Sequence, residues 1–147
     1  MTRGYEVTIY TPFFDPNCCL EEALSCNVEV RGNLFPASIF GACKALCANI
    51  RMLLCAIYVV LFAGAFECYI LDQVSLPIPL LKCRNRRVLF YCHYPDKLLA
   101  VNRGSIIIQI YRLIIDYVEE LTTGMAHKIL VNSEYTKKIF LDHFPLI

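Results

Sequence analysis

The sequence predicts an α/β fold, specifically a Rossmann-like, doubly wound parallel sheet. Short β-branched or aromatic runs alternate with longer helical ones along the chain, an order that is typical of this fold class. The last three short runs are almost continuously apolar, as expected for parallel strands covered on both faces. The five predicted strands are Tyr5–Thr11, Val28–Gly32, Cys68–Asp72, Arg87–Cys92 and Lys128–Asn132.

Four helices are predicted between and after these strands. They run from Ser38 to about Ala63, from Leu76 to Lys82, from Ser105 to about Thr123 and from Ser133 to His143. The third carries one polar stripe, at steps of three and four, on an otherwise apolar helix, which predicts that it is mostly buried. The stripe consists of Ser105, Gln109, Arg112, Asp116, Glu119 and Thr123. The fourth starts with two good capping residues.

Length and composition fit a single domain that is more apolar than usual. The 147 residues include 14 Lys and Arg against 13 Asp and Glu, so charge gives no indication of a nucleic-acid partner. Hydrophobic residues make up 57% and charged residues 18%, against roughly 45–50% and 25% in typical soluble domains. The domain is therefore either deeply buried or in contact with a membrane.

The cysteines are predicted to be free thiols. There are nine, an odd number, and Cys43, Cys47 and Cys55 recur at helical spacing in an apolar stretch, as small core residues do. Free thiols favour a reducing, cytosol-facing compartment. Paired C-x-x-C spacing with nearby histidines is missing, so no zinc site is expected. Neither glycine-rich phosphate-binding motif occurs in the chain.

One apolar segment allows three interpretations. Met52–Phe66 contains fifteen residues without a charge, enough for about 22 Å of helix, whereas a bilayer core is about 30 Å thick. The segment is a core helix of the α/β domain, a helix dipped into or lying along a membrane, or a true span.

Polar residues follow four of the predicted strands. In open α/β sheets, ligands bind outside the carboxyl ends of the strands, so these residues are expected to converge on one edge. They are Asp15, Asp72 with Gln73, His93 with Asp96, and Asn132 with Ser133. Their convergence is a stronger indication of a site than any one of them.

Each of these residues also has an ordinary structural interpretation. His93 lies in "YCHYPD", where Pro95 favours an extended Tyr94, and an imidazole there can donate or accept a proton. A histidine at a strand end is, however, often only structural. Asp72 is equally suited to a turn, and Ser133 to a helix N-cap. His127 and His143 follow helix ends and are interpreted as structural.

Five consecutive segments carry a family resemblance. They read "YEVTIYTPFFDPNCCLEEA", "RGNLFPASIFGACKALCANIRMLL", "DQVSLPIPLLK", "VLFYCHYPDKLLA" and "YRLIIDYVEELTTGMAHKILVNSEYTKKIF". The chain closely resembles the amino-terminal half of the GDP-mannose-dependent alpha-1,3/1,6-mannosyltransferases of dolichol-linked oligosaccharide assembly. These are retaining family-4 glycosyltransferases of the GT-B fold. The most specific pieces are "FYCHYPD", "DQVS" and "TTGMAHKILVNSEYT".

The resemblance implies an enzyme that transfers mannose from GDP-mannose to a dolichyl-diphosphate-linked oligosaccharide. It implies action on the cytosolic face of the endoplasmic reticulum membrane, with Met52–Phe66 as the membrane-associated segment. His93 would be the catalytic residue, and no metal or cofactor besides the donor substrate is expected. The residues expected to bind acceptor or substrate are Asp72, Gln73, Tyr94, Asp96, Asn132 and Ser133.

The chain also departs from the family pattern. A first strand with a glycine-rich loop, and a second domain with the nucleotide-sugar site and its E-x7-E motif, are expected in the family but do not occur in this sequence. Residues 1–147 are therefore expected to form a partial amino-terminal domain that is inactive by itself. Two alternatives remain: a non-catalytic, membrane-associated interaction module, and, less favoured, a soluble nucleotide-binding domain.

Overall fold

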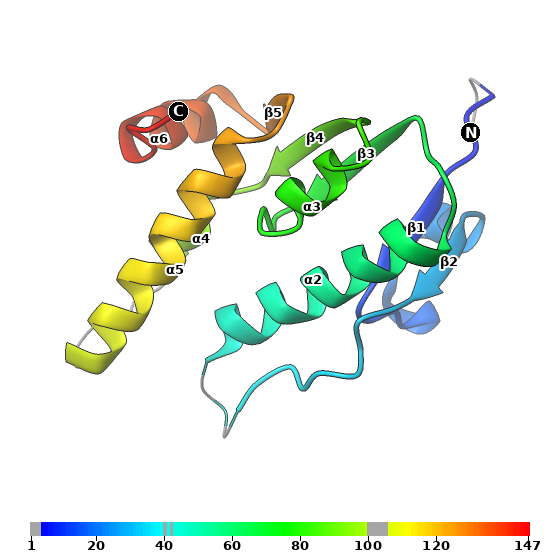
Figure 1. Cartoon of the computed structure of the whole chain (residues 1–147), viewed down its shortest axis with the longest axis horizontal. Helices are drawn as coiled ribbons and strands as arrows, with labels where there is room; N and C mark the ends of the chain where they lie inside the picture. The colour runs from blue at the N-terminus through cyan, green and yellow to red at the C-terminus, as the bar shows by residue number, and fades with distance from the viewer. Residues whose placement is uncertain (1–3, 40, 42, 100–105) are drawn as a thin grey trace. The chain divides into compact units, whose positions relative to one another are not determined.

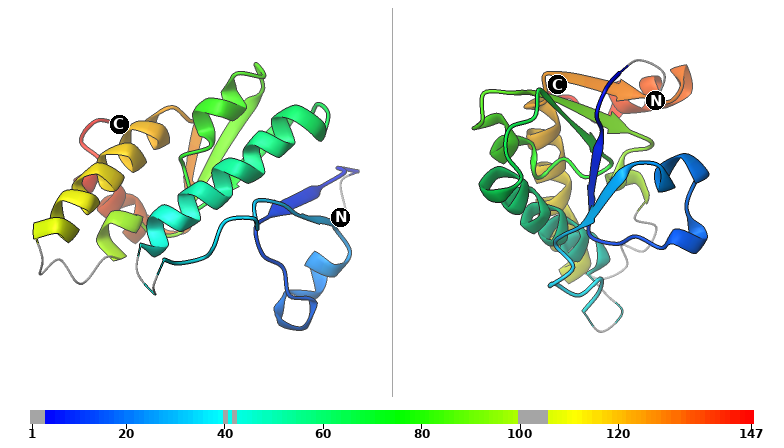
Figure 2. Two further views of the ribbon diagram at one scale, coloured as in Figure 1. Left: turned by 60° about the horizontal axis from the view of Figure 1, so that its bottom comes forward. Right: turned by 90° about the vertical axis from the view of Figure 1, so that its right-hand side faces the viewer.

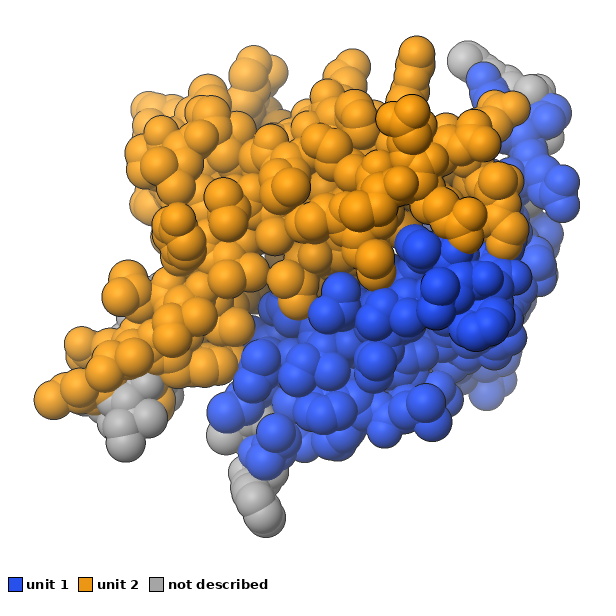
Figure 3. Space-filling model, viewed as in Figure 1, with its two compact units in different colours: residues 1–63 blue, residues 64–147 orange. Residues whose placement is uncertain are grey.

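The computed structural model describes residues 4–39, 41, 43–99 and 106–147. The chain divides into two compact units, Met1–Ala63 and Gly64–Ile147, which Figure 3 colours separately. The α/β class with parallel strands is confirmed, but the five strands form a two-stranded and a three-stranded sheet. Periodicity locates strands without determining which edges pair. The prediction that residues 1–147 form one partial domain stays a prediction.

Unit 1 consists of a small parallel sheet and one long helix (Figure 1). β1 (Thr8–Thr11) pairs with β2 (Asn27–Val30) in parallel register. The 3-10 helix η1 (Pro16–Cys18) and the short helix α1 (Glu21–Leu24) connect them. α2 (Lys44–Phe62) follows as one unbroken helix, shorter at its start than predicted (Figure 2).

One glycine allows the end of β2 to approach α2 closely. Gly32 has a φ of +80°, and a Cβ at this position would lie 2.1 Å from the carbonyl oxygen of Arg51. Any other residue would clash with the helix backbone. The apolar core on the α2 side is formed by Cys47, Cys55, Ala56 and Val59.

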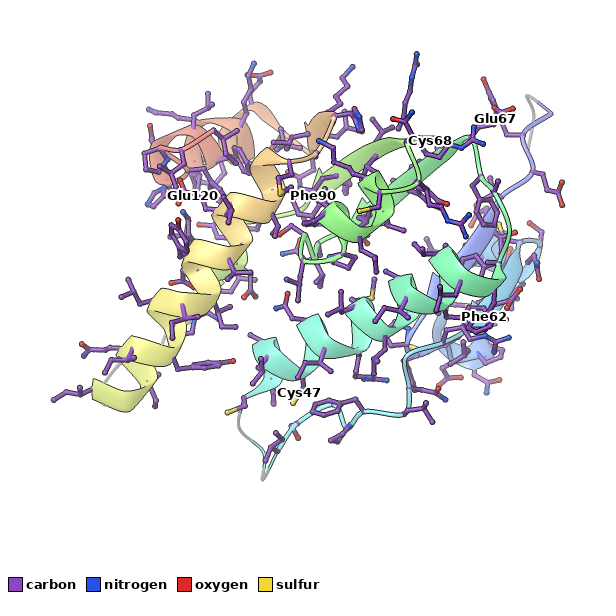
Figure 4. All side chains as sticks on the ribbon, viewed as in Figure 1. Cys47, Phe62, Glu67, Cys68, Phe90 and Glu120 are labelled. Atoms are coloured by element: carbon purple, nitrogen blue, oxygen red, sulfur yellow. The ribbon has the colours of Figure 1, made fainter. Side chains whose placement is uncertain are left out.

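Unit 2 is built on a parallel sheet of order β3-β4-β5. Its strands are Cys68–Asp72, Arg87–Cys92 and Lys128–Val131. Its helices are α3 (Ile78–Lys82), α4 (Asp96–Leu99), α5 (Ile106–Gly124) and α6 (Glu134–His143). The bounds of β3 and β4 are those predicted, while α4 was not predicted. The core includes Leu71, Ile78, Val88, Phe90 and Phe140, and Figure 4 labels Phe90 on the central strand.

The prediction that the strands of unit 2 are covered on both faces is wrong for β3. In β3, Tyr69 and Leu71 are buried but Ile70 between them is 70% exposed. A continuous apolar run establishes only that both faces of a strand are apolar. Whether both are covered depends on which helices pack there.

The prediction that the helix from Ser105 to Thr123 is mostly buried is wrong for its apolar side. Ser105 lies outside the described residues. Six apolar or aromatic residues of α5 are at least half exposed: Ile106, Ile110, Leu113, Ile114, Tyr117 and Leu121. The buried residues are polar instead: Arg112, Glu120, Thr122 and Thr123. From Arg112 onward the polar stripe packs inward, because groups of unit 2 pair with its charges.

All nine cysteines have free thiols. Cys47, Cys55 and Cys92 are buried, so these three serve as small core residues, as predicted.

Candidate functional site

The carboxyl ends of the three strands of unit 2 meet at one edge. In the parallel register, Asp72 lies opposite Tyr91, and Cys92 lies opposite Val131. The residues that follow β3, β4 and β5 are therefore neighbours, as the sequence predicted for these three strands. Asp15 belongs to unit 1, where its Oδ1 accepts a hydrogen bond from the Asn17 N–H at 2.9 Å and so caps η1.

His93 and Asp72 form an exposed pair across two strand ends. Nε2 of His93 lies 3.1 Å from Oδ1 of Asp72, and the side chains are 56% and 68% exposed. The imidazole also packs edge-to-face on Tyr91, with ring centroids 4.7 Å apart. A carboxylate that orients an imidazole is a common arrangement for proton transfer, and here a ligand can reach both groups from solvent.

Gln73 holds the loop that carries His93. Its side-chain amide donates a hydrogen bond to the Tyr94 carbonyl at 2.7 Å and accepts one from the His93 N–H at 3.2 Å. Its backbone lies in the left-handed region, with φ 63°, a conformation that costs a non-glycine residue about 1–3 kcal/mol. The amide of Gln73 is thus used within the protein, which favours a role in positioning His93 over a direct contact with substrate.

Asp96 is held by residues of α5. Its backbone N–H donates to the Glu119 carboxylate at 2.9 Å, and its own carboxylate lies 3.2 Å from Nη1 of Arg112. Arg112 also lies 2.7 Å from a carboxylate oxygen of Asp116. Burial raises the pKa of the Glu119 carboxyl to about 7, while the hydrogen bond from Asp96 lowers it.

Sequence reasoning assigned no functional role to Glu119 or Arg112. Both residues belong to the polar stripe on an otherwise apolar helix, so the signal was present but was interpreted only as a sign that the rest of the helix is buried. The structure shows that the stripe instead contacts the segment that follows His93.

Asn132 and Ser133 lie at the same sheet edge, but their side chains cap α6. The Ser133 hydroxyl accepts a hydrogen bond from the Thr136 N–H at 3.1 Å. The Asn132 side-chain oxygen accepts one from the Thr136 hydroxyl at 2.6 Å. Their recorded hydrogen bonds go to each other and to Thr136, so their predicted role in substrate binding stays a prediction.

Comparison with curated proteins gives consistent matches of one kind. The chain is 45% identical over 142 residues to a Dictyostelium discoideum protein named alpha-1,3/1,6-mannosyltransferase ALG2, covering 94% of this chain and 34% of that protein. Proteins of the same name from Mus musculus and Homo sapiens are 44% and 42% identical, over 98% and 97% of this chain. The resemblance predicted from the sequence is confirmed.

The match covers nearly all of this chain but only part of each relative. The chain spans about a third of the length of these mannosyltransferases. No family model matches the chain, and no solved structure matches it.

The cysteine spacing predicts no zinc site, and this stays a prediction. Among residues 4–39, 41, 43–99 and 106–147, no group of three or more histidine, cysteine, aspartate or glutamate side chains is placed to hold a metal ion.

The other two histidines, His127 and His143, have structural contacts. His127 Nδ1 accepts a hydrogen bond from the Val88 N–H at 3.0 Å, and His143 Nδ1 lies 2.9 Å from the Ile139 carbonyl oxygen.

Proposed function

We propose that this chain forms part of an alpha-1,3/1,6-mannosyltransferase of N-glycan precursor assembly. The enzyme would transfer mannose from GDP-mannose to a dolichyl-diphosphate-linked oligosaccharide at the cytosolic face of the endoplasmic reticulum membrane. The proposal rests on the identity of 42–45% to the mannosyltransferases of three organisms, which extends over at least 94% of the chain. The open sheet edge is where an α/β enzyme binds its substrates.

Within this proposal, His93 is the catalytic residue of the chain. Its imidazole is exposed, lies beside Asp72 and is held in a loop fixed by Gln73. An acceptor hydroxyl bound at this edge could transfer a proton to the imidazole, and the Asp72 carboxylate would stabilise the resulting positive charge. Asp72 and Tyr94 would contact the acceptor from either side of His93.

The membrane association in this proposal is assigned to Met52–Phe66. Most of this segment lies in α2, the one helix among the described residues that is long and apolar enough to cross a membrane, although core helices pass the same test. Most of α2 is not buried in unit 1 or elsewhere in the described structure. The same observation favours the second candidate function, a non-catalytic module that associates with a membrane through α2.

Replacing His93 with alanine tests the catalytic proposal. The natural polypeptide that carries this sequence should be expressed in membranes depleted of the corresponding endogenous activity, then supplied with labelled GDP-mannose and a lipid-linked acceptor. We expect His93→Ala to lower transfer by about 10²–10⁴-fold at unchanged protein level, as loss of a general acid or base does.

His143→Ala is the matched control, because it removes an exposed histidine of unit 2 far along the chain from His93. It should transfer mannose at the wild-type rate. Full activity in His93→Ala would show that His93 is only a structural residue.

The same assay tests the second candidate function. If the wild-type protein associates with membranes but transfers no mannose, the interaction module is supported instead. Resistance to both high salt and alkali would indicate a helix seated among the lipids, whereas release by either would indicate a helix adsorbed on their surface.

A further inference from the structure

One carboxylate from α5 caps a different helix, α4. Oε1 of Glu119 accepts a hydrogen bond from the Asp96 N–H at 2.9 Å, and Oε2 accepts one from the Lys97 N–H at 3.0 Å. Both donors belong to the first turn of α4, whose N–H groups have no partner within their own helix. Helix caps usually come from the residue just before the helix. Here the cap comes from more than twenty residues away.

The short helix α4 needs such support. It has only four residues, too few to be stable without tertiary contacts. Arg112 adds two contacts to Asp96, one to its carboxylate at 3.2 Å and one to its carbonyl oxygen at 3.1 Å. Lys97 forms an ion pair with Glu120 at 3.2 Å and also donates to the carbonyl oxygen of His143.

These contacts fix one end of the segment that carries His93. Only Tyr94 and the buried Pro95 separate His93 from Asp96. Gln73 fixes the other end, through the His93 N–H and the Tyr94 carbonyl. The four-residue segment from His93 to Asp96 is therefore held by Gln73 at the β3 end and by Glu119 and Arg112 of α5.

α5 is itself attached to the β3 end. The hydroxyl of Ser75 donates to the carbonyl oxygen of Glu119 at 3.2 Å and lies 2.8 Å from the hydroxyl of Thr122. Ser75 and Thr122 are buried. A shift of α5 would therefore move both loops that form the His93–Asp72 pair.

We infer that Glu119 is a positioning residue for His93: its ionised carboxylate holds the start of α4 and thereby sets the place of the imidazole at the sheet edge. This inference deepens the proposed function and rests on it only for the chemistry that His93 performs. The positioning itself is a property of the fold of unit 2.

The same geometry makes the cap sensitive to pH. An ionised carboxylate accepts from both N–H groups, whereas a protonated one carries a hydroxyl that donates and leaves one backbone donor without a good acceptor. The groups that act on the Glu119 carboxyl are Asp96 and Lys97 of α4, Asp116 of α5 and Cys92 of β4. Glu120 and Arg112 of α5 contact the same two residues of α4. Since burial raises its pKa to about 7, the cap is complete above neutral pH and weakens below it.

The stability of the fold and the positioning of His93 then change in opposite directions with pH. The pKa of Glu119 rises from an ordinary 4.5 to about 7 on folding, so the folded protein binds the proton more tightly than the unfolded chain. This carboxyl therefore makes the fold more stable as pH falls from 7 towards 4.5. In the same window, the hydrogen bonds that place His93 are weakened.

Hydrogen exchange and activity of Glu119→Gln test the inference. The amide removes the charge at constant shape, and Glu134→Gln makes the same change on the exposed start of α6, so it serves as control. In wild type, exchange of the Asp96 and Lys97 amides, corrected for intrinsic rates, should rise about 10-fold from pH 8 to pH 6. In Glu119→Gln it should be fast at both values. Glu134→Gln should match wild type.

Mannose transfer gives the second measurement. We expect Glu119→Gln to lower kcat by roughly 10–10²-fold, as a misplaced catalytic group does, and to lose the acid limb of the pH profile near 7. KM for GDP-mannose should stay within about 2-fold. Glu119→Asp, which keeps the charge, should restore that limb in part.

The outcomes separate the two proposals. Unchanged protection of the Asp96 and Lys97 amides in Glu119→Gln would overturn the positioning role. A wild-type pH profile in an otherwise slower Glu119→Gln would do the same, because a purely structural defect lowers the rate without moving the profile. The expected exchange pattern in a wild-type protein without transfer activity would support the positioning of the loop and overturn the proposed function.

Discussion

Two long helices of this protein have the same length but pack by different sides, α2 by an apolar side and α5 by a polar one. α2 and α5 each contain nineteen residues. α2 buries apolar residues, Cys47, Cys55, Ala56 and Val59. α5 buries Arg112, Glu120, Thr122 and Thr123 and leaves a largely apolar side exposed. The periodicity of a helix thus shows which residues share a side, but not which side packs inward.

The difference lies in what the polar residues contact. In α2, Arg51 reaches the Pro12 carbonyl at 2.6 Å at the edge of unit 1, and the rest of the packed side is apolar. In α5, the charged residues contact α4 and the segment that follows α6, which offer a carboxylate, an ammonium group and backbone N–H groups. A buried charge is tolerated when it is paired, so α5 packs by its polar side.

The largest loss of stability should come from removing the positive charge of Arg112 on the polar side of α5. Arg112→Leu removes the guanidinium that pairs with both Asp96 and Asp116, and the repulsion of these carboxylates on Glu119 is then less compensated. Breaking a buried ion pair from one side costs about 3–5 kcal/mol. Denaturant unfolding should show this loss. Arg84→Leu, on an exposed loop, should change stability by no more than about 0.5 kcal/mol. Equal stabilities for the two variants would mean that the polar side of α5 contributes nothing to packing.

A smaller loss of stability is expected from shortening a buried side chain on the apolar side of α2. Val59 is 5% exposed, and Val59→Ala removes two methyl groups and leaves a cavity, at a cost of roughly 2 kcal/mol. Leu61 lies two residues further along and is 63% exposed. Leu61→Ala should therefore have almost no effect in the same measurement. A larger loss for Leu61→Ala than for Val59→Ala would show that α2 packs by the other side.

The comparison also separates what the sequence could and could not predict. The bounds of β3 and β4 follow from their short apolar runs. The meeting of Asp72 with His93 follows from parallel pairing, because the carboxyl ends of parallel neighbours lie together. The left-handed turn at Gln73 and the cap from Glu119 do not. Each depends on a tertiary contact between residues twenty or more positions apart, and no local pattern encodes which hydrogen bond a side chain will make.

The smallest effect on stability, and the sharpest test of the comparison, concerns the exposed side of α5. Leu113 is 70% exposed, so Leu113→Gln should change the free energy of unfolding by no more than about 0.5 kcal/mol. Apolar patches this continuous usually lie against another surface. Leu113→Gln should therefore raise solubility at unchanged stability, measured as the concentration at which the protein precipitates. A loss of 2 kcal/mol or more would mean that Leu113 is buried in the folded protein, and that α5 packs by its apolar side as α2 does.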